Sequence, residues 1–89
     1  MPEVWIPALL RNLTLGQERV TVPGANIGQV IDELDKQFPG IRERLCAGGS
    51  LRPGIAVAVD SQIARLGLLQ PVAEASEIHF LPAVSGGAE

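Results

Sequence analysis

One bounded helical pattern, flanked on both sides by strand-like segments, constrains the fold of this chain more than any other feature. The apolar residues that recur at helical spacing are Ile27, Val30, Ile31, Leu34 and Phe38. Asn26 is expected to cap this helix, because Gln29 follows it at capping-box spacing, and Pro39-Gly40 ends it. Gly28, early in the helix, is expected to permit close packing.

Two segments before the helix are predicted to be strands. Residues 4–10 are extended and apolar, and Pro7 should face an unpaired side or a bulge because it cannot donate to a ladder. Residues 18–22 alternate polar and apolar side chains, as a half-buried strand does. A turn at Leu15-Gly16-Gln17 joins the two segments, so we expect an antiparallel hairpin.

The segment directly after the helix carries a weaker pattern. Residues 41–45 are predicted to form one short helical turn, and residues 47–52 a loop that contains Gly48-Gly49. Ile55–Val59 is nearly all apolar and β-branched at alternate positions. This composition indicates a strand that is buried on both faces or central in a sheet.

The remaining sequence is predicted to complete the sheet. After a turn at Asp60-Ser61, residues 62–75 should give a short edge strand and a turn around Pro71. Residues 77–81 form the last strand, which Pro82 stops.

This order of elements predicts an α+β fold of the β-grasp kind, in which one main helix packs across a mixed sheet of four or five strands. The side chains expected to be buried against the helix are Val4, Ile6, Val20, Val22, Val57, Val59, Ile78 and Phe80. At about 1.5–3 kcal/mol for each fully buried side chain, this set offsets the ordering cost of a small domain. Residues 1–83 should form the domain and residues 84–89 a flexible tail, because nothing after Val84 is bulky enough to pack.

Composition excludes several classes of function. The formal charge of −3 and scattered basic residues argue against nucleic acid or an anionic membrane as the main partner. Cys46 is the one cysteine, so it makes no internal disulfide and offers no zinc site. The first residues lack the pattern of a secretion signal, and no apolar run is long enough to span a membrane, so we expect a cytoplasmic protein.

The pair Gly86-Gly87 gives the tail a specific chemical use. Two residues without Cβ atoms can thread a narrow channel, and the chain from Leu81 to Gly87 could reach about 20 Å at roughly 3.3 Å per residue. A terminal glycine carboxylate would then enter another protein's active site, where ATP could convert it to an adenylate that a sulfur nucleophile attacks. The domain itself would supply no catalytic group, since its tail is the substrate.

Several segments resemble the MoaD/ThiS family of ubiquitin-like sulfur carriers along essentially the whole chain. The matching segments are residues 4–11 in the first strand, 27–34 in the helix, and 38–41 with 44–45 in the turn after it. The strongest match is Phe80-Leu81-Pro82-Ala83-Val84-Ser85-Gly86-Gly87, which is similar to the family's ending of strand, Pro-x-Val-x-Gly-Gly. Within the family, the chain is most similar to the CysO-like carriers of cysteine synthesis.

The resemblance implies a complete functional cycle. A ThiF/MoeB-like activating enzyme would use ATP to adenylate the Gly87 carboxylate and convert it to a thiocarboxylate, while the carrier itself binds no cofactor. Val84, Ser85 and Gly86 would thread the enzyme's channel. The sulfur would then pass to an acceptor in a biosynthetic synthase, which for CysO-like carriers is an activated serine.

The two residues after Gly87 depart from the family's usual pattern. Because Ala88 and Glu89 follow it, Gly87 is an amide and cannot be adenylated. Carriers of the quinolobactin type (QbsE-like) have a comparable extension that a JAMM-type zinc metalloprotease removes, which implies cleavage after Gly87. A vestigial extension or an inactive form is the alternative.

Other candidate groups have simpler interpretations. The neighbours of Cys46 supply no base or positive field, so we expect a small buried hydrophobe. His79 alternates with the buried positions and should lie on the outer face of the sheet with Leu81. No nucleophile is identifiable beside His79, so both residues are candidates for partner contact rather than catalysis.

Two functions compete with the sulfur carrier. The chain could be a non-covalent β-grasp subunit of a larger enzyme, or a ubiquitin-like modifier whose Gly87 is joined to a target lysine. An independent enzyme is disfavoured, because the sequence contains no phosphate loop, no metal-ligand spacing and no triad.

Overall fold

The sheet has five strands in the order β2-β1-β7-β5-β6, in a computed structural model that describes residues 1–82. The strands are β1 (Glu3–Trp5), β2 (Arg19–Thr21), β5 (Ile55–Val59), β6 (Gln62–Ile63) and β7 (Glu77–Pro82). β1 runs parallel to β7 and the other neighbours are antiparallel, so the predicted mixed sheet and its first hairpin are confirmed. The predicted tail at 84–89 lies outside the described residues.

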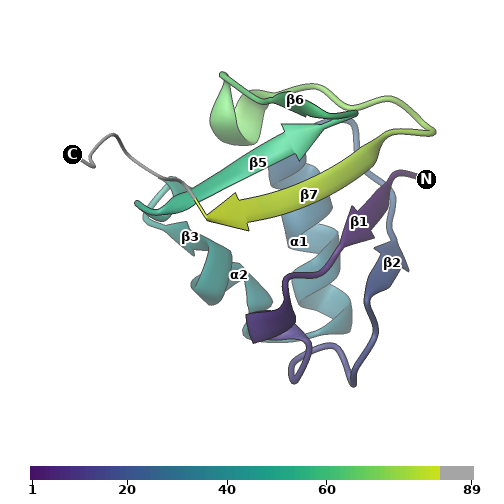
Figure 1. The fold of residues 1–89 in the computed structure, drawn as a ribbon, viewed down its shortest axis with the longest axis vertical. Coiled ribbons are helices and arrows are strands. Elements are labelled where there is room, and N and C mark those ends of the chain that lie inside the picture. Colours follow the sequence, from purple (N-terminus) through teal and green to yellow (C-terminus); the bar gives the residue numbers. More distant parts are fainter. Residues whose placement is uncertain (83–89) are drawn as a thin grey trace.

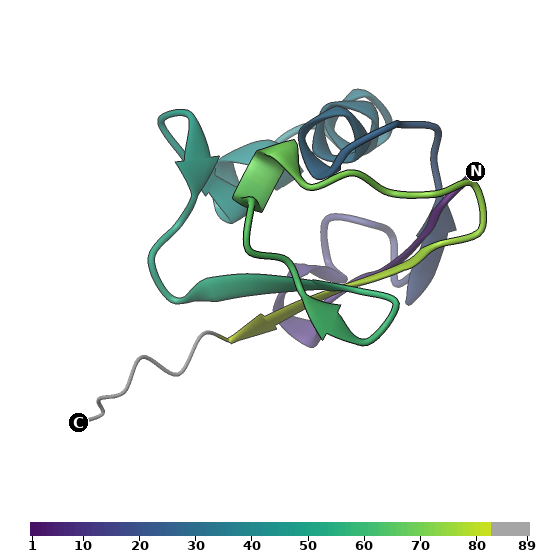
Figure 2. The same cartoon turned by 90° about the horizontal axis from the view of Figure 1, so that it is seen from above.

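The predicted helix is α1 (Ile27–Gln37), and it covers one face of the sheet (Figure 1). The Asn26 Oδ1 atom accepts a hydrogen bond from the Gln29 N–H at 2.8 Å, which confirms the cap. The Gln29 side chain closes the box one residue earlier than expected, on the Ala25 N–H at 2.9 Å. Figure 2 shows α1 on one side of the sheet. Within residues 1–82, no helix is long and apolar enough to cross a membrane.

The hydrophobic core lies between α1 and the sheet. Every predicted core side chain is buried except that of Val59, which is half-buried and packs against the core. Gly28 permits the expected close packing, because a Cβ atom there would lie only 3.3 Å from the Leu68 carbonyl oxygen of η2 (Gly67–Leu69). The core therefore combines the buried face of α1 with alternate positions of the strands, and Ile41, Leu45 and Leu10 from shorter helical segments complete it.

The prediction that residues 4–10 are extended throughout is wrong. β1 ends at Trp5, and Ala8–Leu10 forms a 3-10 helix, η1. Pro7 precedes η1 with φ −60° and accepts the Leu10 N–H at its carbonyl, 2.9 Å away. Proline suits this position, because its fixed φ and missing N–H cost nothing before the first helical residue.

The predicted helical turn is α2 (Ile41–Leu45), but the loop predicted after it contains a small hairpin. Cys46–Ala47 (β3) pairs with Ser50–Leu51 (β4) around Gly48-Gly49. Gly48 has φ +66°, which glycine adopts without strain and which closes so short a turn. The prediction that β5 is buried on both faces or central is confirmed in its first form, since Val57 and Ala58 are buried on its two faces, while the central strand of the sheet is β7.

Candidate functional site

The tail follows β7, the central strand of the sheet. β7 pairs with β1 on one side and with β5 on the other, and its last residue, Pro82, is opposite Ile55. The predicted site residues Val84, Ser85, Gly86 and Gly87 lie outside the described residues. What the structure shows is the root of the tail and the two surfaces that flank it.

The first surface is on the face of the sheet opposite α1. We call it the outer patch, and its residues are Trp5, Ala56, Ala58, Ile63, His79 and Leu81, with Arg19 at its edge. The strand register aligns Arg19, Trp5, His79, Ala58 and Ile63 in one row across the five strands. His79 and Leu81 are thus on the outer face, as predicted.

Aromatic contacts organise the outer patch. The rings of Trp5 and His79 stack with their centroids 5.2 Å apart and an angle of 12° between planes. The Arg19 guanidinium carbon lies 5.1 Å from the centre of the Trp5 ring on which it packs, which is a cation–π distance. The indole of Trp5 is thereby held between two neighbouring strands.

The polar groups at this surface make few close hydrogen bonds or ion pairs within residues 1–82. Glu3 is 4.0 Å from Arg19 and Glu77 is 3.8 Å from His79, and exposed pairs at such distances add little stability. The Trp5 Nε1–H group is buried and has no hydrogen-bond partner within residues 1–82. Leu81 is 39% exposed and Ile63 is 58% exposed, so part of this face is apolar surface open to a partner.

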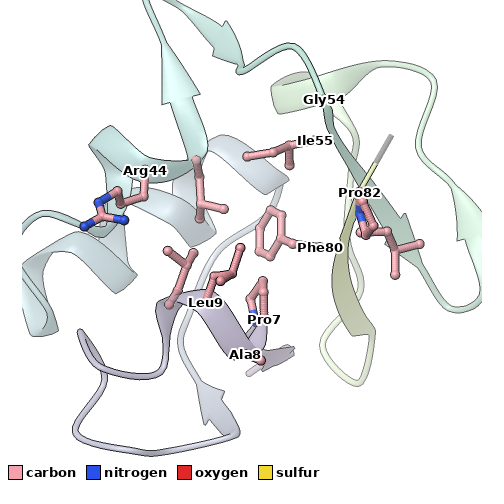
Figure 3. Close-up of a pocket in the computed structure, with 11 residues that line it drawn as sticks. Pro7, Ala8, Leu9, Arg44, Gly54, Ile55, Phe80 and Pro82 are labelled. Atoms are coloured by element: carbon pink, nitrogen blue, oxygen red, sulfur yellow. The ribbon is translucent and has the colours of Figure 1, made fainter. Parts of the chain in front are cut away.

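The second surface is a groove on the other side of β7. This root groove has a volume of about 430 Å³ and lies between η1, α2 and the paired ends of β5 and β7 (Figure 3). Its walls include Leu9, Leu45, Ile55, Phe80 and Pro82, all of them apolar. Arg44 is the one charged residue of the lining, and in Figure 3 its side chain extends away from Phe80 toward the outer rim.

The described residues offer little for independent catalysis. Cys46 is free and 6% exposed, and burial raises the pKa of its thiol, which reduces the fraction of reactive thiolate. Its predicted role as a small buried hydrophobe is confirmed. Within residues 1–82, no cluster of three or more His, Cys, Asp or Glu side chains could hold a metal ion.

Sequence reasoning missed Trp5 and Arg19 as parts of the outer patch. Trp5 lies between Val4 and Ile6, which were both predicted to be buried, so alternation alone would have placed its ring on the outer face. The residues that contact Trp5 could not be predicted in the same way. They depend on the parallel register of β1 with β7, which joins the two ends of the chain.

Comparison with known proteins decides the family. A family model described as "ThiS family" matches residues 4–87. The chain belongs to the ThiS family. This match includes every strand of the sheet except the first residue of β1, and it ends at Gly87, so Ala88 and Glu89 lie beyond it.

Individual ThiS-family relatives are similar over nearly the whole chain. The sulfur carrier protein CysO of Mycobacterium tuberculosis is 36% identical over 94% of this chain and 96% of its own. The CysO chain of the Amycolatopsis orientalis BexX/CysO complex superposes with a TM-score of 0.89 at 34% identity, covering 98% of this chain and 100% of that one. SAMP1 from Haloferax volcanii superposes with a TM-score of 0.72 at 30% identity, covering 97% and 98%.

These ThiS-family relatives confirm the predicted class of protein. The CysO relatives are small ubiquitin-like carriers rather than enzymes, and the fold of this chain matches theirs. The similarity to CysO supports the predicted role as a sulfur carrier.

Proposed function

We propose that this chain carries sulfur as a thiocarboxylate on Gly87, after Ala88 and Glu89 have been removed. The observation that carries this proposal is the family match, which extends from the first strand to Gly87 and no further. In an activating enzyme of the ThiF/MoeB kind, a carboxylate oxygen of Gly87 attacks the α-phosphorus of ATP and pyrophosphate leaves. Sulfide sulfur from a donor then displaces AMP and gives the thiocarboxylate.

The pairing of β7 supports this use of the tail. Pro82 is fixed by its register with Ile55, so the first tail residue starts from a defined point at the edge of the domain. From Pro82, five residues reach Gly87, a span of at most about 17 Å. The rigid domain would therefore stay outside the enzyme while the glycine carboxylate enters its active site.

The outer patch is the proposed docking surface for the activating enzyme. Leu81 and His79 lie on the strand that continues into the tail, and Trp5 is stacked on His79. An apolar and aromatic surface of this kind suits a protein interface, in which Trp and Arg are enriched. The remaining partners in the proposal are a JAMM-type metalloprotease that cuts after Gly87 and a synthase that accepts the sulfur.

Intact-mass analysis of the chain from its native host tests this function. We expect a species that ends at Gly87 and a second one in which sulfur replaces a carboxyl oxygen. A chain truncated after Gly87 should be adenylated without the protease, and Gly86→Val should abolish its adenylation because the tail no longer threads.

The chain provides a matched control for the tail variant. Gly49 belongs to the other Gly-Gly pair, and a Cβ atom there meets nothing within 4 Å, so Gly49→Val should leave the reaction unchanged. If every molecule retains Ala88 and Glu89 while the pathway is active, the carrier proposal is wrong.

One neighbour favours a second candidate function. SAMP1 of Haloferax volcanii is a small archaeal modifier protein, and it is 30% identical to this chain. Modifier activity would join Gly87 to lysine side chains of other proteins. Proteomic detection of Gly-Gly remnants on lysines that vanish with Gly86→Val would establish it, and their absence would leave sulfur transfer alone.

A further inference from the structure

The tail is rooted between two apolar surfaces that face away from each other. Side chains alternate along β7, so the Leu81 side chain belongs to the outer patch while Phe80 and Pro82 border the root groove, and Leu81 also contributes to the groove lining where the two surfaces meet. The proposed docking of the outer patch leaves the groove unexplained. Its walls contain no hydrogen-bonding side chain except Arg44, which favours an apolar occupant.

The mouth of the root groove combines an exposed leucine with an exposed cation. Leu9 is 87% exposed although it sits on the short rigid turn of η1. Arg44 is exposed and has no salt-bridge partner within residues 1–82, whereas Arg42 on the same helix is paired with Asp32. Other arginines also lack an ion pair within residues 1–82, but in a chain with a formal charge of −3 Arg44 is the charged residue that lines the groove.

The length of the tail brings a partner to this groove. An enzyme that holds the Gly87 carboxylate lies within about 17 Å of Pro82, since Gly87 is only five positions further along the chain. Pro82 itself lines the groove. A protein interface of ordinary size covers about 800 Å² on each partner, so a contact of that size centred on the root of the tail would include the groove mouth as well as the outer patch.

We infer that the root groove is a second docking site for the activating enzyme, which places an apolar side chain between Leu9 and Phe80 and a carboxylate against Arg44. This inference rests on the proposed function, because that enzyme must take up the tail. A carboxylate is the group whose charge complements Arg44. Because Arg44 lies at the rim, the enzyme's carboxylate would stay outside the apolar walls of the groove. The groove then distinguishes a matching enzyme from one that only recognises the outer patch.

Steady-state adenylation of the chain ending at Gly87 tests the groove. Arg44→Glu should raise the KM for the carrier about tenfold, and Leu9→Ser severalfold. The kcat should stay within about twofold of the parent value, since the tail and its reacting carboxylate are unchanged. Arg44→Lys keeps the charge and should recover most of the loss.

Two substitutions elsewhere provide matched controls. Leu15 is 85% exposed, nearly as much as Leu9, but does not line the groove, so Leu15→Ser should leave KM unchanged. Arg65→Glu changes the net charge as Arg44→Glu does, at an exposed site away from the groove. Equal effects of Arg65→Glu and Arg44→Glu would overturn the inference, because they would show general attraction rather than a local contact.

Methyl NMR of the carrier separates the possible occupants. Signals of Leu9, Leu10 and Ile55 should shift when the activating enzyme is added. If they shift instead when Val84 is replaced by Ser in the free chain, or when the free chain is diluted, the occupant is the tail or a second copy and the inference fails. If the parent chain is never adenylated, both the proposed function and the docking site that rests on it are wrong.

Discussion

The two faces of the five-stranded sheet both carry apolar side chains but differ in how much of that apolar surface is buried. On the inner face, Val4, Val57 and Ile78 are at most 1% exposed beneath α1. On the outer face, the Trp5–His79 stack is bordered by Leu81 and Ile63, which remain 39% and 58% exposed. Alternation along each strand separates the two sets completely.

This difference assigns stability to one face and recognition to the other. A buried aliphatic side chain contributes to the free energy of unfolding through lost solvent contact and through close packing. The outer side chains have only partial contacts to lose, so their substitution should change partner binding before it changes stability. Substitutions at adjacent residues of a single strand should therefore change different properties, stability at one position and partner binding at the next.

The largest expected effect is a contrast within β7. Ile78→Ala should lower the free energy of unfolding by about 3 kcal/mol, because it leaves a cavity under α1, whereas Leu81→Ala should cost less than about 1 kcal/mol. Urea unfolding followed by the fluorescence of Trp5, the one tryptophan, measures both. Similar losses for the two variants would break the comparison of the faces.

A smaller effect concerns the helix that creates the inner face. Asn26→Ala removes the acceptor for the Gln29 N–H at the start of α1 and should cost about 1 kcal/mol. Asn12→Ala, at an exposed residue of the turn before β2, is the matched control and should change stability little. Once folded, the Asn26 variant should be adenylated with an unchanged KM, since the outer patch and the root groove are intact.

The sequence predicted the inner face better than the surfaces around the tail. The helix was predictable because its period, its cap at Asn26 and its Pro39-Gly40 ending are all local signals. The outer positions of His79 and Leu81 also followed from alternation. The stack of Trp5 on His79 did not, because it requires the register between strands more than 70 residues apart in sequence.

The root groove had no sequence signal at all. Four separate segments form it, around residues 7–10, 44–45, 54–55 and 80–82. Its shape depends on η1, which ends the extended run at Pro7, and the apolar composition of residues 4–10 favoured a longer strand instead. The two-residue strands β3 and β4 were missed for a related reason, since periodicity needs several residues to be recognised.

The smallest expected effect is a pH dependence of stability that arises from Cys46, on the buried side of the molecule. Burial raises the pKa of this thiol from its ordinary value of 9.0, with Asp32 acting in the same direction and Arg42 and Arg52 against it. As the pH rises above 9.0, the unfolded chain releases the thiol proton before the folded chain does. The folded state then binds more protons, so its stability should fall as the pH rises through this window up to the folded pKa.

Urea midpoints compared between neutral and alkaline pH would isolate this contribution. Cys46→Ala should flatten the alkaline decline, whereas His79→Ala on the outer face should leave it as in the parent chain. The Cys46 contribution is the difference between the parent and Cys46→Ala slopes, so other alkaline titrations cancel in the comparison. An identical decline in the parent and in Cys46→Ala would assign the alkaline loss of stability to groups other than this thiol. The buried side of the molecule would then show no pH dependence that distinguishes it from the exposed face.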